Sequence, residues 1–116
     1  MADKYNLDID AGATYQLTVT WNDSVGDPIN LTGFTARMKL KSTYGGDALV
    51  SLTDTDGLTL GGAAGTVAIT ISDTLTATLA DTDHTKGVYD LEVESSGGVT
   101  TRLLEGRWTC SPEVTD

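Results

Sequence analysis

The chain has 116 residues, a net charge of −10 and a hydrophobic fraction of 39%, which predicts a single domain over residues 1–116 with one core. Phosphate backbones and anionic membranes repel so acidic a surface, so nucleic acids and membranes are excluded as expected partners. The single cysteine, Cys110, excludes a disulfide within the chain, and the sequence has neither a secretory signal pattern nor an apolar run of membrane length. The acidic balance indicates solubility or, alternatively, a basic partner.

Alternation of apolar and polar residues predicts strands throughout the first half of the chain. The predicted strands are 5–9, 15–21, 34–41 and 48–53, and 58–60 is either a brief strand or part of a connection. We expect their inward rows to be Tyr5, Leu7 and Ile9; Tyr15, Leu17, Val19 and Trp21; Phe34, Ala36, Met38 and Leu40; and Val50 with Leu52. Turn residues such as Gly, Asn, Asp and Pro separate these segments.

The outer face of the 34–41 strand is basic. Arg37, Lys39 and Lys41 are three of the seven basic residues in the chain. They either offset acidic residues on neighbouring strands or form a basic strip that docks an acidic partner.

The segment from 66 to 80 changes from a strand pattern to a helical one. Val67, Ile69 and Ile71 form another inward row, whereas Leu75 and Leu79 are four residues apart. Ser72 or Asp73 is a suitable helix cap, so residues 72–80 are predicted to form one or two helical turns.

A β-hairpin is predicted near the C-terminal end. Its first arm, 87–94, places Tyr89, Leu91 and Val93 on one face, and the Gly-rich turn 95–98 leads into the return arm 99–110. This return arm is expected to place Trp108 in the core and Cys110 beside it as a small buried filler.

About seven strands with turn signals between them predict an all-β fold, an antiparallel β-sandwich. The short helical crossing before the penultimate strand and a tyrosine near the start of that strand are typical of immunoglobulin-like folds. Tyr89 is therefore either such a corner tyrosine or an ordinary core aromatic.

Residues suited to catalysis or metal binding are sparse. His84 is the only histidine, and no nucleophile or orienting partner is placed beside it. The pairs Asp54/Asp56 and Asp81/Asp83 fit turn chemistry or, alternatively, calcium, although neither stretch supplies an EF-hand ligand set. Residues 61–65 are Gly-rich but lack the Gly-Lys-Ser/Thr ending of a phosphate loop. The sequence therefore predicts a non-enzymatic protein without a cofactor.

Several stretches match one family in order along nearly the whole chain. They are 12–17, 26–33, the 34–41 strand with Arg37 on its outer face, 87–93 and 102–115, which includes a Gly-x-aromatic-x-x-x-Pro pattern from Gly106 to Pro112. Together they resemble small phage structural domains, including the N-terminal domain of phage baseplate upper proteins, which anchors receptor-binding proteins to the tail.

The resemblance implies an immunoglobulin-like virion component, assembled in the host cytoplasm, that contacts other virion proteins and copies of itself. Longer relatives continue into a fibre or receptor-binding region, and this chain ends at Asp116, so we expect an adaptor in the tail, baseplate or fibre region. A capsid decoration protein is the first alternative. A carbohydrate-binding sandwich that aids adsorption is the second. The aromatics available for a sugar platform are Trp21, Trp108, Tyr44 and Tyr15, of which we expect only Tyr44 to be exposed.

Overall fold

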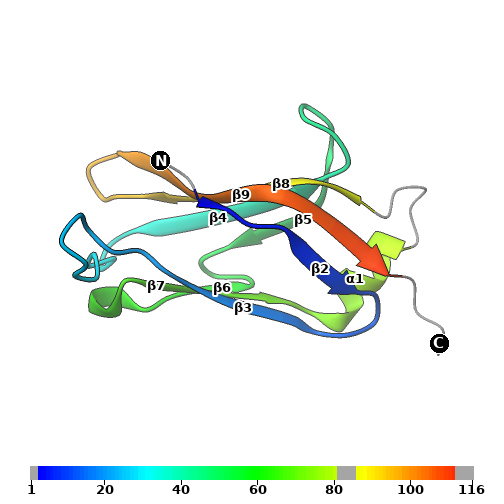
Figure 1. Ribbon diagram of the computed structural model, residues 1–116, viewed down its shortest axis with the longest axis horizontal. Coiled ribbons are helices and arrows are strands. Elements are labelled where there is room, and N and C mark those ends of the chain that lie inside the picture. The colour runs from blue at the N-terminus through cyan, green and yellow to red at the C-terminus, as the bar shows by residue number, and fades with distance from the viewer. Residues whose placement is uncertain (1–2, 81–85, 112–116) are drawn as a thin grey trace.

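The computed structural model describes residues 3–80 and 86–111, which form two β-sheets packed face to face with a short helix at one end (Figure 1). The larger sheet has the order β1-β9-β8-β4-β5, with β2 also paired to β9, and the smaller sheet has the order β3-β7-β6. The strands are β1 Asp3–Lys4, β2 Leu7–Asp10, β3 Tyr15–Thr20, β4 Thr35–Lys41, β5 Ala48–Thr53, β6 Leu58–Leu60, β7 Thr66–Ile71, β8 Lys86–Glu94 and β9 Thr100–Ser111. The helices are the 3-10 turn η1, Gly62–Ala64, and the α-helix α1, Asp73–Ala80.

The all-β sandwich predicted from the sequence is confirmed, but its N-terminal edge differs from the expectation. The single strand expected over 5–9 is divided into β1 and β2, and both pair with β9 in parallel rather than antiparallel. Tyr5 lies at the break with 47% of its surface exposed, so its predicted inward position is wrong. The structure has nine strands where about seven were predicted. The division into β1 and β2 adds one strand, and the brief β6 adds the other.

The core follows the predicted rows elsewhere. In β4, β5 and β7 the inward residues are buried, and the most enclosed include Met38, Leu52 and Ile69. Alternate side chains of a strand point to opposite faces, so each row reaches the space between the sheets. The row on β3 differs, because Tyr15, Leu17, Val19 and the following Trp21 are only half-buried.

Helix α1 confirms the predicted helical crossing. The Leu75 N–H donates to the Ser72 hydroxyl at 3.2 Å, which satisfies an otherwise free donor at the helix start. The buried Thr76 hydroxyl accepts from the Gly12 N–H at 3.1 Å and donates to the Ala13 carbonyl at 2.8 Å. The helix therefore anchors the corner between β2 and β3.

The predicted C-terminal hairpin is confirmed, with an irregularity that sequence alternation does not show. Leu91 pairs with Leu104, whereas Glu92 pairs with Arg102, so Leu103 is an extra residue in β9. An extra residue of this kind changes the direction of the side chains on its strand. As a result Leu103 and Leu104 are both buried although they are adjacent.

Tyr89 holds the N-terminal segment to the sheet. Its hydroxyl donates to the carbonyl oxygen of Tyr5, whereas a corner tyrosine donates to backbone a few residues upstream. Gly106, opposite Tyr89 in β9, allows this approach because a Cβ atom there would collide with the Tyr5 carbonyl. Of the two alternatives for Tyr89, the structure therefore supports the core aromatic.

Candidate functional site

Strand β3 has a free edge. Within residues 3–80 and 86–111 it pairs only with β7, because β1 and β2 both lie beside β9 in the other sheet. Figure 1 shows β3 as the outer strand of the smaller sheet, with β2 and β9 in the layer above it. One side of the β3 backbone is therefore available for pairing.

The direction of the β3 backbone groups follows from the ladder with β7. The Trp21 N–H donates to the Gly65 carbonyl at 2.8 Å, one step beyond the Thr20–Thr66 pair. Residues of an antiparallel pair alternate between bonding to the partner and facing away from it. The N–H and C=O groups of Gln16, Thr18 and Thr20 consequently point away from β7.

The other sheet edges carry features that discourage pairing with another chain. Strand β6 has three residues, and β5 contains a bulge at Leu49, which has no partner in β4. The edge formed by β1 and β2 is interrupted and bears Lys4, Asp8 and Asp10. By contrast β3 pairs in regular register over six residues and contains no charge and no proline. Edges without such protection readily accept an added strand.

A groove runs beside the free edge of β3, mainly apolar near Leu17 and Leu104 and mainly polar near Thr20 and Arg102. It consists of two hollows of about 450 Å³ and about 420 Å³ between β3 and the facing sheet edge. We call it the β3 groove; Leu17 and Val19 line it on one side, and Leu103 and Leu104 line it on the other. This opening explains why the inward side chains of β3 are only half-buried.

The β3 groove is free of acidic side chains. Its charged lining residues are Lys4 and Arg102, although the chain has 17 acidic and 7 basic residues. The three strands of the smaller sheet contain no charged residue at all. A neutral or acidic segment can therefore approach β3 without meeting a carboxylate in the groove.

The basic face of β4 divides into a paired and an unpaired part. Arg37 Nε lies 3.0 Å from a Glu92 carboxylate oxygen, and Arg37 Nη1 lies 3.2 Å from a Glu94 carboxylate oxygen; these contacts raise the pKa of the Arg37 guanidinium. Arg37 thus offsets acidic residues on the neighbouring strand, as one alternative predicted. Lys39 and Lys41 make no ion pair within the described ranges.

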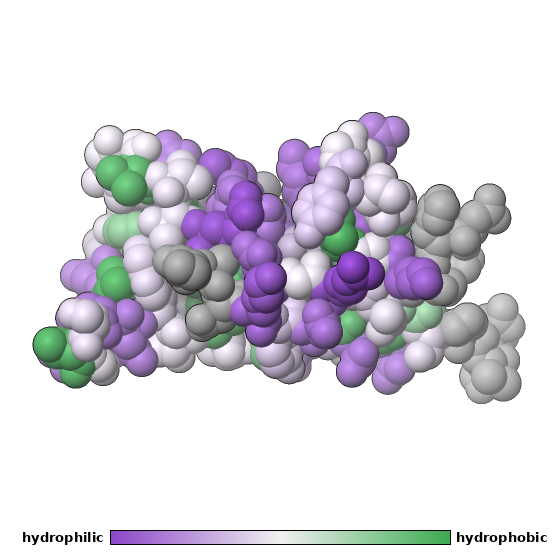
Figure 2. All heavy atoms as spheres, turned by 45° about the horizontal axis from the view of Figure 1, so that its top comes forward, coloured by the Kyte–Doolittle hydropathy of each residue, from purple (hydrophilic) through white to green (hydrophobic). Residues whose placement is uncertain are grey.

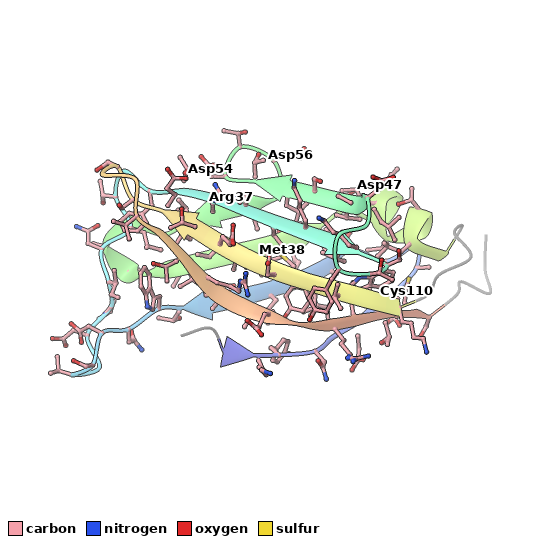
Figure 3. The ribbon with its side chains drawn as sticks, turned by 90° about the horizontal axis from the view of Figure 1, so that it is seen from above. Arg37, Met38, Asp47, Asp54, Asp56 and Cys110 are labelled. Carbon is pink, nitrogen blue, oxygen red and sulfur yellow. The ribbon has the colours of Figure 1, made fainter. Side chains whose placement is uncertain are left out.

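Of the two acidic pairs singled out in the sequence, Asp54/Asp56 lies in the described part of the chain. Asp54 accepts a hydrogen bond from the Ala36 N–H at 3.3 Å, which is turn chemistry. Figure 3 shows Asp54 and Asp56 at the turn after β5 and Asp47 in a separate loop. No group of three or more His, Cys, Asp or Glu residues suited to a metal occurs among residues 3–80 and 86–111. Asp81, Asp83 and His84 lie outside the described residues.

Cys110 is the buried filler that the sequence predicted. It is 4% exposed, and its thiol lies 3.7 Å from the Thr76 carbonyl oxygen. Burial raises the pKa of the Cys110 thiol, and the nearby Asp10 raises it further. A thiol that resists ionisation in this way is a poor nucleophile.

The sequence predicted a buried Trp108 and an exposed Tyr44, and both predictions are confirmed. Trp108 is fully buried, and Tyr44 is 87% exposed. Hydrophilic side chains cover much of the surface over the larger sheet (Figure 2). No helix in the described part of the chain is long and apolar enough to span a membrane.

Comparison with known proteins identifies the fold and no closer relationship. Neither protein-family models nor curated protein sequences gave a match. The extracellular domain of the voltage-gated sodium channel beta4 subunit is similar with a TM-score of 0.53 and 12% identity, over 98% of this chain and 96% of that chain. Tim-1 is similar with a TM-score of 0.51 and 16% identity, over 100% and 99%.

A chicken T-cell receptor (TCR) chain is similar with a TM-score of 0.57 and 16% identity, over 97% of this chain and 56% of that chain. This chain has an immunoglobulin-like fold. The structural work on the beta4 domain describes parallel homodimers and a role in cell-cell adhesion. At such low identity the likeness extends to the fold alone.

The β3 groove was not foreseen from the sequence. It depends on the parallel pairing of β1 and β2 with β9 and on the extra residue Leu103. The available signal was the absence of charge from Ala11 to Asn22, which is a long neutral run for a strand at a sheet edge.

Proposed function

We propose that the protein is a non-enzymatic virion structural protein, an adaptor or accessory subunit in the tail, baseplate or fibre region of a phage. The resemblance of its sequence to phage tail domains suggests the setting. The observation that carries the proposal is the free, uncharged and regular edge of β3 beside a groove that is mainly apolar near Leu17 and Leu104. Such an edge suits assembly through backbone pairing.

The occupant we propose for the β3 groove is an extended, alternating apolar and polar segment of a neighbouring virion protein. Its backbone would pair with Gln16, Thr18 and Thr20, and its inward side chains would fill the space between Val19 and Leu104. Lys4 and Tyr5 lie across the groove from β3, so the space suits one added strand better than a second sandwich. The neutral lining of β3 favours a segment with few charges.

Repetition strengthens such contacts. A tail or capsid presents the same surface many times, and modest individual contacts then gain from multivalency. Copies of this chain would lie next to one another in such a lattice. The homodimers described for the beta4 domain offer a precedent for self-association in this fold.

A capsid decoration protein is the second candidate, because the same edge could accept a segment of a capsid subunit. Location within the particle separates the two. Immunogold electron microscopy of phage particles, with antibodies against this chain, should label the tail or baseplate. Labelling of the capsid alone would favour decoration, and particles without label would contradict the virion assignment.

Pairing at β3 can be tested with two charge insertions. Thr18→Lys places a charge on the free edge, whereas Thr70→Lys places the same charge on the outer face of the central strand β7. We expect Thr18→Lys to reduce incorporation into particles and Thr70→Lys to leave it near the wild-type level. Equal incorporation of both variants would contradict the role of β3.

A further inference from the structure

The cations on the outer face of the larger sheet fall into two groups. Arg37 and Arg102 each lie within 4.0 Å of acidic side chains. Lys39, Lys41, Lys86 and Arg107 also lie on this face, and none of them makes an ion pair within residues 3–80 and 86–111. We call these four residues the basic patch.

Strand register places the basic patch around one apolar residue, Val88. Val88 lies opposite Lys41 in β4 and opposite Arg107 in β9. Lys39 is two residues from Lys41 in β4, and Lys86 is two residues from Val88 in β8. Side chains two residues apart on a strand point to the same face, so all four lie on the outer face of the sheet. In a chain of net charge −10, this gathering of cations is suited to an anion, with a single acidic neighbour, Asp90, opposite Lys39 in β8.

Two hollows flank Val88 within the basic patch. One, of about 140 Å³, is lined by Lys39, Lys41, Tyr44 and Asp90. The other, of about 160 Å³, is lined by Lys86 and Arg107 together with Val88, Trp108 and Thr109. The two hollows lie on either side of Val88, each with basic side chains beside a largely apolar floor.

Tyr44 and Asp90 define what kind of anion would fit. The Tyr44 ring is 87% exposed, so it presents an aromatic face at the rim of the first hollow. Asp90 lies 3.5 Å from Arg102, which partly offsets its charge and leaves a carboxylate that can accept hydrogen bonds. An aromatic face, cations and a hydrogen-bond acceptor together suit a ring that carries both hydroxyl groups and a negative charge.

We propose that the basic patch binds an acidic saccharide. Its carboxylate would lie between Lys39 and Lys41, its ring would stack on Tyr44, and its hydroxyls would donate to Asp90. Lys86 and Arg107 would attract the next acidic residue of the same glycan. A densely charged polyphosphate is disfavoured, because Asp90 lies in the hollow and the chain as a whole is strongly acidic. The proposal is independent of assembly through β3, which lies on the other sheet.

The test uses tetragalacturonate as the acidic probe and its methyl ester as the neutral control, with titration calorimetry at low salt. The ester retains the rings and hydroxyls and removes the charges. We expect binding of the acid, little binding of the ester, and weaker binding as salt is added, since the interaction is electrostatic. Failure of the acid to bind, or equal binding of the ester, would overturn the proposal.

Single variants locate the site. Lys41→Gln should weaken binding of the acid about tenfold, because it removes one charge-assisted contact. Thr70→Glu lowers the net charge by the same amount on the outer face of the other sheet and should change the affinity less than about twofold. A similar loss in both variants would show non-specific attraction and contradict the proposal.

Tyr44→Ala distinguishes a saccharide from an acidic protein. We expect this variant to weaken binding of the acid about fivefold through loss of the stacking face. Poly-L-glutamate is the competing probe. If it binds as tightly as the tetragalacturonate and Tyr44→Ala has no effect, the basic patch accepts acidic protein segments and the saccharide proposal is wrong. Because Tyr44 is so exposed, the variant should keep the wild-type circular dichroism spectrum.

Discussion

The indole nitrogen of Trp108 donates a hydrogen bond to the carbonyl oxygen of Lys41 at 3.0 Å, and the ring itself is fully buried. This bond joins β9 to the end of β4 across the intervening strand β8. Gly87 of β8 lies opposite Trp108 in register. A Cβ atom at Gly87 would collide with the Lys41 carbonyl and come within 2.7 Å of the indole nitrogen.

Trp108→Ala should destabilise the protein by about 3–5 kcal/mol, because it removes a large buried ring and leaves a cavity. Trp108→Phe keeps part of the packing and loses the hydrogen bond, so its cost should be smaller. Urea denaturation followed by circular dichroism measures both free energies of unfolding. A cost below about 1 kcal/mol for Trp108→Ala would show that the ring is not the centre of the core.

Gly87→Ala should destabilise the protein by about 1–3 kcal/mol, because the added methyl group forces apart the backbone and the indole. Gly97→Ala is the matched control, since its nearest new contact would be Ser95 Oγ at 3.9 Å. The control should change stability by less than about 0.5 kcal/mol. Equal effects of the two substitutions would mean that β8 has room at Gly87.

Tyr89→Phe should cost about 1–2 kcal/mol and loosen the N-terminal strands, because it leaves the Tyr5 carbonyl without its donor. Burial raises the pKa of the Tyr89 hydroxyl, so the wild-type bond should persist into mildly alkaline solution. Amide exchange measured by mass spectrometry should increase in residues 3–10 of the variant. Unchanged exchange in that segment would contradict the anchoring role of Tyr89.

The Cys110 thiol should be unreactive in the folded protein. It is buried, and its raised pKa reduces the fraction of thiolate at any given pH. Ellman's reagent at pH 8 should therefore label the native protein slowly and the urea-unfolded protein rapidly. Rapid labelling of the native protein, at the unfolded rate, would show that β9 opens readily near its end.

Local patterns in the sequence were sufficient for much of the fold. The alternation in β7 and the Ser72 cap of α1 are properties of neighbouring residues, and both elements occur where they were predicted. The bond from Tyr89 to Tyr5 joins residues 84 positions apart, and local periodicity carries no information about such partners.

The β3 groove required long-range information of the same kind. The sequence indicates that 5–9 is a strand, but it does not indicate which sheet receives it. Pairing of β1 and β2 with β9 leaves β3 uncovered, and the extra residue Leu103 turns a second leucine inward. The residues of the basic patch are also distant in sequence, and only strand register brings Lys41 and Arg107 to either side of Val88.

The most direct test of strand addition at β3 is amide exchange of the peptide spanning residues 14–21, compared between the isolated protein and the protein in purified phage particles. In the isolated protein the outward amides of Gln16, Thr18 and Thr20 should exchange quickly, because nothing in the described structure pairs with them. In the particle these amides should become protected when a neighbouring segment bonds to them. Equally fast exchange in the particle and in isolation would contradict the account.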